Sequence, residues 1–277
     1  MSLPLPFILS IPHGGLEAPP EVADRHALTD EELFTECDAF TRELYGMSDA
    51  VLGEVTQDVA RAFVDLNRPP DDLPPATDDG AVKTATRFGR LVWRDGEVPE
   101  ADLQRTLLER YYHPYHRRLA ELLEARRDEV RLLIDCHTMS GTGPPAAKDA
   151  GARRPLICLS NLGDENGNAG RHGRTSVPQA VLERLRDIMA DVFAPEFASS
   201  DHPHPITLNR PFLGGHITSH YSARGLWVVQ IELSKDLYLH PRWFDPTSRS
   251  MDGGRLSDLN AMVRTALAEL ARSPELS

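Results

Sequence analysis

Two histidines stand directly after apolar segments, where the chain would leave a β-strand. His13 lies in the turn PHGG after the run LPFILSI, and His137 lies in DCHT after the run RLLI. Paired glycines after His13 would let backbone and ligand approach closely. Two histidines and one carboxylate make up the three-ligand, open zinc site of many hydrolytic enzymes. The residue types therefore predict a catalytic zinc site, although a turn with an incidental histidine is the simpler explanation for His13 alone.

Two carboxylates compete for the third position on the metal. Glu17 is close to His13 in the sequence, and Asp38 lies in a segment that we expect to be helical. Spacing alone slightly favours Glu17. Asp135 stands two residues before His137, so the two share a face if the strand continues that far. Asp135 could then orient the imidazole, as metal-bound histidines usually require, or it could cap the next turn.

A glutamate interrupts the apolar segment WVVQIEL. A carboxylate at Glu232 is costly inside a buried strand unless it is paired or functional. Next to a metal site it would be a natural general base, and an ion pair with a core arginine is the structural alternative. The sequence therefore gives Glu232 a candidate catalytic role.

Further polar groups follow two other segments. The motif VDLNRP carries Asn67 and Arg68, with Arg61 seven residues before Arg68. Arginine matches a carboxylate with a rigid fork, and asparagine offers both a donor and an acceptor. The motif GGHIT carries His216 and Thr218, which are available to a substrate. Solvated arginines in a surface turn are the alternative for the first motif, and the second motif is weak in isolation.

Alternating strands and helices would have to position these groups. Uninterrupted apolar strands indicate burial on both faces of a sheet, and the alternation predicts an α/β fold with a mixed, mostly parallel sheet. Sites in such folds lie at the carboxyl ends of the strands. The Pro- and Asp-rich segment 69–82 is expected to be a loop and the best candidate for a flexible flap. We expect strands at 5–11, 59–66, 131–136, 155–161 and 227–233, and helices at 30–46, 101–126, 177–193 and from 256 onward.

The overall composition narrows the possible partners. The 277 residues carry a formal charge of −12, which argues against nucleic-acid or anionic-membrane binding but not against a small anionic substrate. No apolar run approaches the roughly 20 residues of a membrane span. Three scattered cysteines fit the cytoplasm rather than a disulfide scaffold. We expect a single domain over 1–277, and the sequence does not indicate an oligomeric state.

The order of six short motifs resembles the N-formylglutamate amidohydrolase family. The motifs are SIPHGG, CDAFTRELY, RAFVDLNRP, LLIDCHTMSG, FLGGHITSHY and VQIEL followed four residues later by Tyr, and they extend from about residue 8 to about 240. The family is similar to the zinc carboxypeptidase and aspartoacylase group. The resemblance therefore implies a three-layer, phosphorylase/hydrolase-like α/β/α fold with one zinc ion.

The resemblance also implies a role for individual residues. It favours Asp38 over Glu17, because Asp38 precedes the helix ending in Leu-Tyr. The implied metal ligands are His13, Asp38 and His137, the implied catalytic groups are Glu232 and Arg61, and the implied substrate-binding groups are Asn67, Arg68, His216 and Thr218.

The implied reaction is the zinc-dependent hydrolysis of N-formyl-L-glutamate to L-glutamate and formate, in histidine degradation. Two alternatives stay open at this point. One is a zinc carboxypeptidase or an N-deacylase for another acyl amino acid. The other is a non-catalytic binder of a small anionic metabolite.

Overall fold

A six-stranded sheet forms the centre of the computed structural model, which describes residues 3–170 and 173–276. The strands lie in the order β2-β1-β3-β6-β4-β5. Neighbouring strands are parallel except that β4 runs antiparallel to β6. The sheet is therefore mixed and mostly parallel, as predicted. The bounds are β1 Leu5–Ile11, β2 Val51–Thr56, β3 Leu132–Met139, β4 Ile157–Ser160, β5 Ile206–Leu208 and β6 Val228–Ser234.

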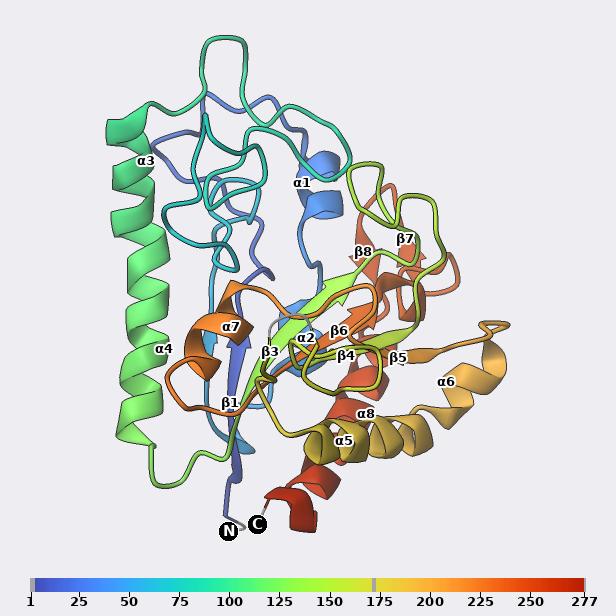
Figure 1. The fold of residues 1–277 in the computed structure, drawn as a ribbon. Coiled ribbons are helices and arrows are strands. Elements are labelled where there is room, and N and C mark those ends of the chain that lie inside the picture. Colours follow the sequence, from blue (N-terminus) through green and yellow to red (C-terminus); the bar gives the residue numbers. More distant parts are fainter. Residues whose placement is uncertain (1–2, 171–172, 277) are drawn as a thin grey trace.

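Helices cover both faces of this sheet (Figure 1). One face packs against α3 (Ala101–Leu107), α4 (His113–Ala125) and α7 (His216–Ser222). The other face packs against α2 (Thr41–Tyr45), α5 (Gln179–Val192) and α8 (Gly253–Leu270). Each face has its own cluster of buried apolar side chains, so the fold has the predicted three layers. The smaller elements are α1 Asp30–Glu36, α6 Ala194–Ser199, β7 Phe244–Asp245 and β8 Ser250–Met251.

Most predicted elements are present with shifted ends. The helix predicted over 101–126 is α3 and α4 joined by one π-helical turn, Leu108–Tyr112. The segment expected as one helix over 30–46 instead breaks after Glu36. Its chain turns through Phe40, whose φ of 62° lies in the left-handed region, before α2 begins. This break places Asp38 outside a helix.

The strand predicted over 59–66 is wrong. That segment is buried throughout but runs as turns. Its backbone N–H groups donate to the carbonyls of Glu17 and Ala81 and, within the segment, to the carbonyl of Ala60. Its aromatic and β-branched residues fill the core and do not extend the sheet. The strand on that side is β2, which the sequence analysis missed because Gly53 interrupts its apolar pattern. A Cβ at Gly53 would lie 2.9 Å from a Leu122 methyl carbon, so the glycine lets α4 pack closely on β2.

The loop predicted over 69–82 is present, and ion pairs hold it to the core. The carboxylate of Asp79 binds both Arg68 and the ammonium of Lys83. Lys83 is fully buried and also lies 3.2 Å from Asp65 and 3.7 Å from Glu36. The buried Lys83 therefore ties the loop, through Asp79, to Asp65 in the core. Whether its tip moves as a flap stays a prediction.

The three cysteines are free and buried. Among the described residues, no helix combines the length and apolar character that a membrane span requires.

Candidate active site

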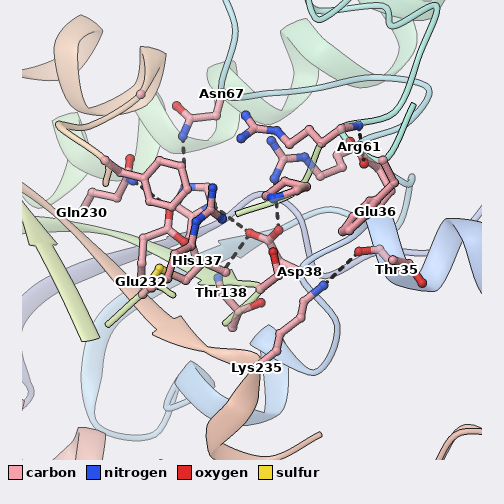
Figure 2. Close-up of a pocket in the computed structure, with 18 of the residues that line it drawn as sticks. Thr35, Glu36, Asp38, Arg61, Asn67, His137, Thr138, Gln230, Glu232 and Lys235 are labelled. Atoms are coloured by element: carbon pink, nitrogen blue, oxygen red, sulfur yellow. Dashed lines mark hydrogen bonds and ion pairs between the residues drawn. The ribbon is translucent and has the colours of Figure 1, made fainter. Parts of the chain in front are cut away.

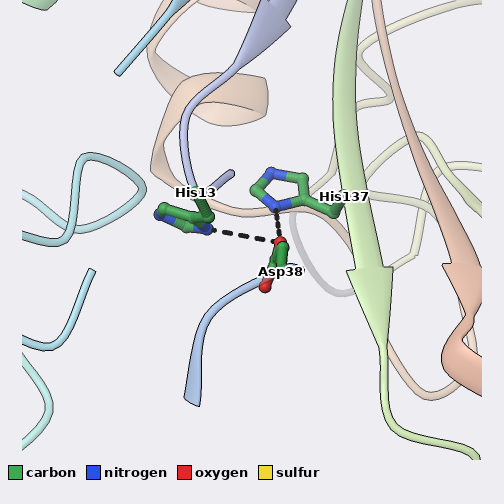
Figure 3. Close-up of side chains that lie close together, drawn as sticks. All are labelled: His13, Asp38 and His137. Atoms are coloured by element: carbon green, nitrogen blue, oxygen red, sulfur yellow. Dashed lines mark hydrogen bonds and ion pairs between the residues drawn. The ribbon is translucent and has the colours of Figure 1, made fainter. Parts of the chain in front are cut away.

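Three side chains from separate parts of the chain meet above the sheet edge (Figure 3). His13 follows β1, Asp38 follows α1, and His137 belongs to β3. One ligand atom from each lies within 4.8 Å of the others. Asp38 Oδ2 is 3.0 Å from His137 Nδ1 and 3.6 Å from His13 Nδ1. Glu17, the alternative from spacing, is exposed and joins its surroundings through its backbone.

This group fits a zinc ion. His13 Nδ1 is buried and has no hydrogen-bond partner among the described residues, although it points toward Asp38. Two imidazole nitrogens and one carboxylate oxygen are a common donor set of catalytic zinc. A buried lone pair without a donor is costly unless something binds it. The arrangement can therefore hold a metal ion.

A carboxylate contacts the Nε2 atom of each imidazole, while Nδ1 faces Asp38. His13 Nε2 lies 2.9 Å from Asp65 Oδ1, and His137 Nε2 lies 3.0 Å from Asp135 Oδ1. A proton on each Nε2 leaves the Nδ1 lone pair free for a metal, and such pairing is usual for metal-bound histidine. Asp135 thus has the orienting position considered from its spacing. Asp65 has the same position, which the sequence analysis did not anticipate.

Arg61 joins Asp38 to Asp65. Its Nη1 donates to Asp38 Oδ1 over 3.1 Å, and its Nη2 donates to Asp65 Oδ2 over 2.8 Å. Burial opposes ionisation of Asp38, but Arg61 and the two imidazoles outweigh it and hold the pKa of this carboxyl well below its usual range. Asp38 is therefore ionised at neutral pH, as a carboxylate ligand of a metal would have to be.

Glu232 lies directly beside the metal group. It occupies the β6 position opposite His137 on β3, and Gln230 Nε2 donates to its Oε1 over 2.9 Å. Burial raises the pKa of Glu232 to about 7, against the opposing effect of the nearby His137 charge. A carboxylate with this pKa is suited to accept a proton and return it at neutral pH.

A polar pocket opens over these groups (Figure 2). Asp38, His137 and Glu232 line it, whereas His13 does not. The pocket also has a strongly cationic wall. The positively charged side chains that line it are Arg61, Arg68, Arg87, Arg154 and Lys235.

The predicted substrate-binding residues fall into two groups. Asn67 and Arg68 line the pocket, and the Asn67 amide lies 3.1 Å from His137 Nε2. His216 and Thr218 do not line it. The His216 ring packs against His116 and His220, and the Thr218 hydroxyl donates to Asp135.

Sequence reasoning missed three of the pocket cations. Arg87 and Arg154 lie in loops, and neither follows a recognisable strand. No periodic pattern indicates where such loops fold back. Lys235 could have been found, because it directly follows the strand that carries Glu232. Asp65 could also have been found as a charged residue in the apolar run AFVDL.

Solved structures share this fold. An N-formylglutamate amidohydrolase from Ralstonia eutropha JMP134 superposes with a TM-score of 0.71 and 18% identity, covering 98% of this chain and 96% of that chain. A gene product from Agrobacterium tumefaciens gives a TM-score of 0.62 and 16% identity, covering 96% and 90%. At these identities the likeness shows the fold alone.

Sequence relatives and a family model identify the family. N-formylglutamate deformylase from Pseudomonas putida is 30% identical over 243 residues, which are 85% of this chain and 82% of the relative. Its namesake from Pseudomonas aeruginosa is 29% identical over 242 residues, with the same coverage. The model of the family described as N-formylglutamate amidohydrolase matches residues 5–239. The chain therefore belongs to the N-formylglutamate amidohydrolase family.

Proposed function

We propose that this protein is a zinc-dependent amidohydrolase that converts N-formyl-L-glutamate and water into L-glutamate and formate. The observation that carries the proposal is the convergence of His13, Asp38 and His137 beside Glu232 in a cationic pocket. Family membership and relatives named N-formylglutamate deformylase support the choice of substrate.

Three residues would hold the metal through His13 Nδ1, His137 Nδ1 and an Asp38 oxygen. Bound there, Zn²⁺ supplies Lewis acidity and makes water a usable nucleophile near pH 7. Asp65 and Asp135 keep the two imidazoles in the required tautomer. Arg61 holds Asp38 and adds positive charge where the carbonyl oxygen becomes negative.

Glu232 would transfer a proton from the attacking water to the leaving amide nitrogen. Its carboxylate takes a proton from the attacking water as the new carbon–oxygen bond forms on the formyl carbon. It then gives this proton to the amide nitrogen as the carbon–nitrogen bond breaks, so the products are a free amine and formate. Gln230 donates to Glu232 Oε1 and so fixes the direction of the second oxygen.

The start of α7 would support the substrate side of the pocket. The N–H of Ile217 donates to Asn67 Oδ1 over 2.8 Å, and the Thr218 hydroxyl donates to Asp135 Oδ2 over 3.3 Å. His216 donates its backbone N–H to the Asn67 carbonyl. We therefore assign Asn67 to substrate contact, and His216 and Thr218 to holding Asn67 and Asp135 in place.

Two measurements test this function. Purified protein should keep about one zinc per chain through dialysis and should hydrolyse N-formyl-L-glutamate, whereas His137→Ala should lose both properties. N-acetyl-L-glutamate and short peptides ending in glutamate serve as competing substrates. Preference for either would assign the protein to another N-deacylase or to a carboxypeptidase, and full activity without metal would refute the zinc mechanism.

A further inference from the structure

Two arginines of the pocket direct most of their hydrogen bonds at protein groups. Arg61 spans two carboxylates, as described above. Arg68 donates from Nε and Nη2 to the backbone and carboxylate of Asp79, each over 2.8 Å, and from Nη1 to the Asn67 carbonyl. Arg68 therefore ties the loop to the site. It has little left to offer a substrate.

Two other cations are similarly engaged. Arg154 donates from Nε and Nη2 to both oxygens of Asp149, and its guanidinium lies over the Phe212 ring. The Lys235 ammonium donates to the carbonyls of Thr35 and Cys37 over 3.1 and 2.6 Å. Both charges hold segments of the pocket wall together.

Arg87 differs from these four. Its guanidinium makes no hydrogen bond to any described residue. The Nε atoms of Arg87 and Arg61 are both buried without a partner, but Arg61 binds two carboxylates through Nη1 and Nη2. The nearest carboxylate oxygen, Asp79 Oδ2, is 3.8 Å away and already receives Arg68. Burial and the neighbouring Arg61 charge lower the pKa of Arg87, which reflects a site with too little negative charge. A guanidinium in this setting is ready for an anion from outside.

Two hydrogen bonds fix the backbone of Arg87. Its N–H donates to Glu36 Oε2 over 3.0 Å, and its carbonyl accepts from the N–H of Ala146 over 3.1 Å. The side chain is about 25% exposed and lines the pocket. Arg87 is thus a placed charge on the pocket wall, which lowers the entropic cost of binding.

We propose that Arg87 binds the side-chain carboxylate of the substrate and thereby selects N-acyl derivatives of acidic amino acids. This inference rests on the proposed function and names a residue that selects the substrate. Arg87 makes no hydrogen bond or ion pair with the candidate metal ligands or Glu232, whereas Arg61 binds Asp38 directly. We therefore assign Arg87 to a part of the substrate other than the reacting amide. A guanidinium pairs with a carboxylate through two parallel hydrogen bonds.

The test compares two substrates that differ only in side-chain charge, N-formyl-L-glutamate and N-formyl-L-glutamine. Arg87→Met should lower kcat/KM for N-formylglutamate by roughly 10- to 150-fold, mostly through KM, because one charge-assisted contact is lost. N-formylglutamine turnover should change less than about threefold. Arg87→Lys keeps the charge without the fork and should fall between. Arg90→Met is the matched control, because Arg90 is exposed and pairs with Glu32 outside the pocket.

The outcomes separate this inference from the proposed function. Wild-type protein that cleaves neither substrate refutes the proposed function. Wild-type protein that cleaves both equally well, or an Arg87→Met variant that loses equally on both, refutes only the role of Arg87. Glutarate binding measured by calorimetry gives a readout without turnover and should weaken by the same factor in Arg87→Met. Unchanged glutarate affinity in both Arg87 variants would overturn the inference.

Discussion

Each candidate histidine ligand is held from behind by a buried carboxylate. Asp65 serves His13, and Asp135 serves His137, and both aspartates are fully buried. Arg61 and Lys83 compensate the charge of Asp65, whereas Asp135 accepts from neutral donors on Asn67 and Thr218. The imidazole directions are thus set by protein contacts alone. A metal would meet ligands that are already oriented, so little ordering has to occur on binding.

Replacing Glu232 with glutamine tests its role as the base. The change keeps the shape and removes the proton acceptor, so kcat should fall roughly 100- to 10,000-fold. Zinc content should not change, because Glu232 is outside the His13, Asp38 and His137 group. Steady-state kinetics and elemental analysis of the same preparation measure both quantities. Glu129→Gln is the control, since Glu129 is exposed and pairs with Arg126. Turnover near the wild-type rate in Glu232→Gln would remove this residue from the mechanism.

The sequence indicates those site residues that lie within or directly after apolar strands. His13 follows β1, whereas His137 and Glu232 belong to the last residues of β3 and β6, and the structure places all three at the carboxyl-terminal edge of the sheet. Spacing alone slightly favoured Glu17 over Asp38 because sequence distance says nothing about the break after α1. The place of Arg87 in the pocket could not be predicted for a related reason. Its position depends on how a long irregular segment folds back, which no local pattern encodes.

Close approach between α7 and the segment 59–68 shapes the site at the scale of elements. A Cβ on Gly215 would lie 2.3 Å from the Asn67 amide nitrogen. Asn67 can therefore reach His137 and the start of α7 only because residue 215 has no side chain. The motifs VDLNRP and GGHIT therefore lie side by side because of this contact.

Gly215→Ala should displace the Asn67 side chain. We expect a roughly 10- to 100-fold loss of kcat/KM, because Asn67 would lose its hydrogen bonds to Asp135 and to the N–H of Ile217, and a stability loss of about 1–3 kcal/mol from overpacking. Kinetics and denaturant unfolding measure the two effects. Gly253→Ala is the control: Gly253 begins α8 in open space, so its change should leave activity intact. A fully active Gly215→Ala variant would show that Asn67 need not hold its position.

Element prediction succeeded where periodicity was strong. The helices α5 and α8 and the strands β3 and β6 were predicted because their apolar residues repeat or run without interruption. The segment 59–66 misled because it is as apolar as a strand but is buried inside a wall of turns. β2 was missed because the glycine that admits α4 weakens its pattern. Both errors arise from packing between elements, which a single segment does not record.

At the scale of the whole molecule, charge is unevenly distributed. The chain carries a net charge of −12, yet five cationic side chains line the pocket. A low-dielectric pocket focuses the field of its own charges, so an anionic substrate would be attracted locally despite the overall sign. The net charge is therefore compatible with a dicarboxylate substrate.

Global stability should depend on pH through a histidine cluster between α4 and α7. Burial lowers the pKa of His116 from its ordinary 6.5 to about 4, with a smaller contribution from the charges of His216 and His220. The unfolded chain therefore binds more protons than the folded chain between pH 6.5 and 4. Stability from this group is complete above pH 6.5 and is lost as the pH falls toward 4, by about 3 kcal/mol. The other groups facing His116 are Tyr112, Tyr221, Asp135 and the Leu66 carbonyl.

Urea unfolding at pH 7 and pH 4.5 checks this expectation. His116→Gln keeps a donor for the Leu66 carbonyl and should reduce the stability difference between the two pH values. His113→Gln, an exposed position on the same helix, should leave the difference unchanged. An identical pH dependence in wild type and His116→Gln would assign the effect to other groups.

The irregular loops that carry Arg87 and Arg154 are separate from the segments that carry His13, Asp38 and His137. The residues proposed for catalysis and the residue proposed for substrate choice therefore lie in different stretches of the chain. Mutations can accumulate in the loops without disturbing the strands beneath them. If the proposed function holds, such a chain can diverge toward other acyl amino acids while keeping the same hydrolytic step. Substitutions would be tolerated in the loops that carry Arg87 and Arg154, whereas His13, Asp38 and His137 would have to be kept.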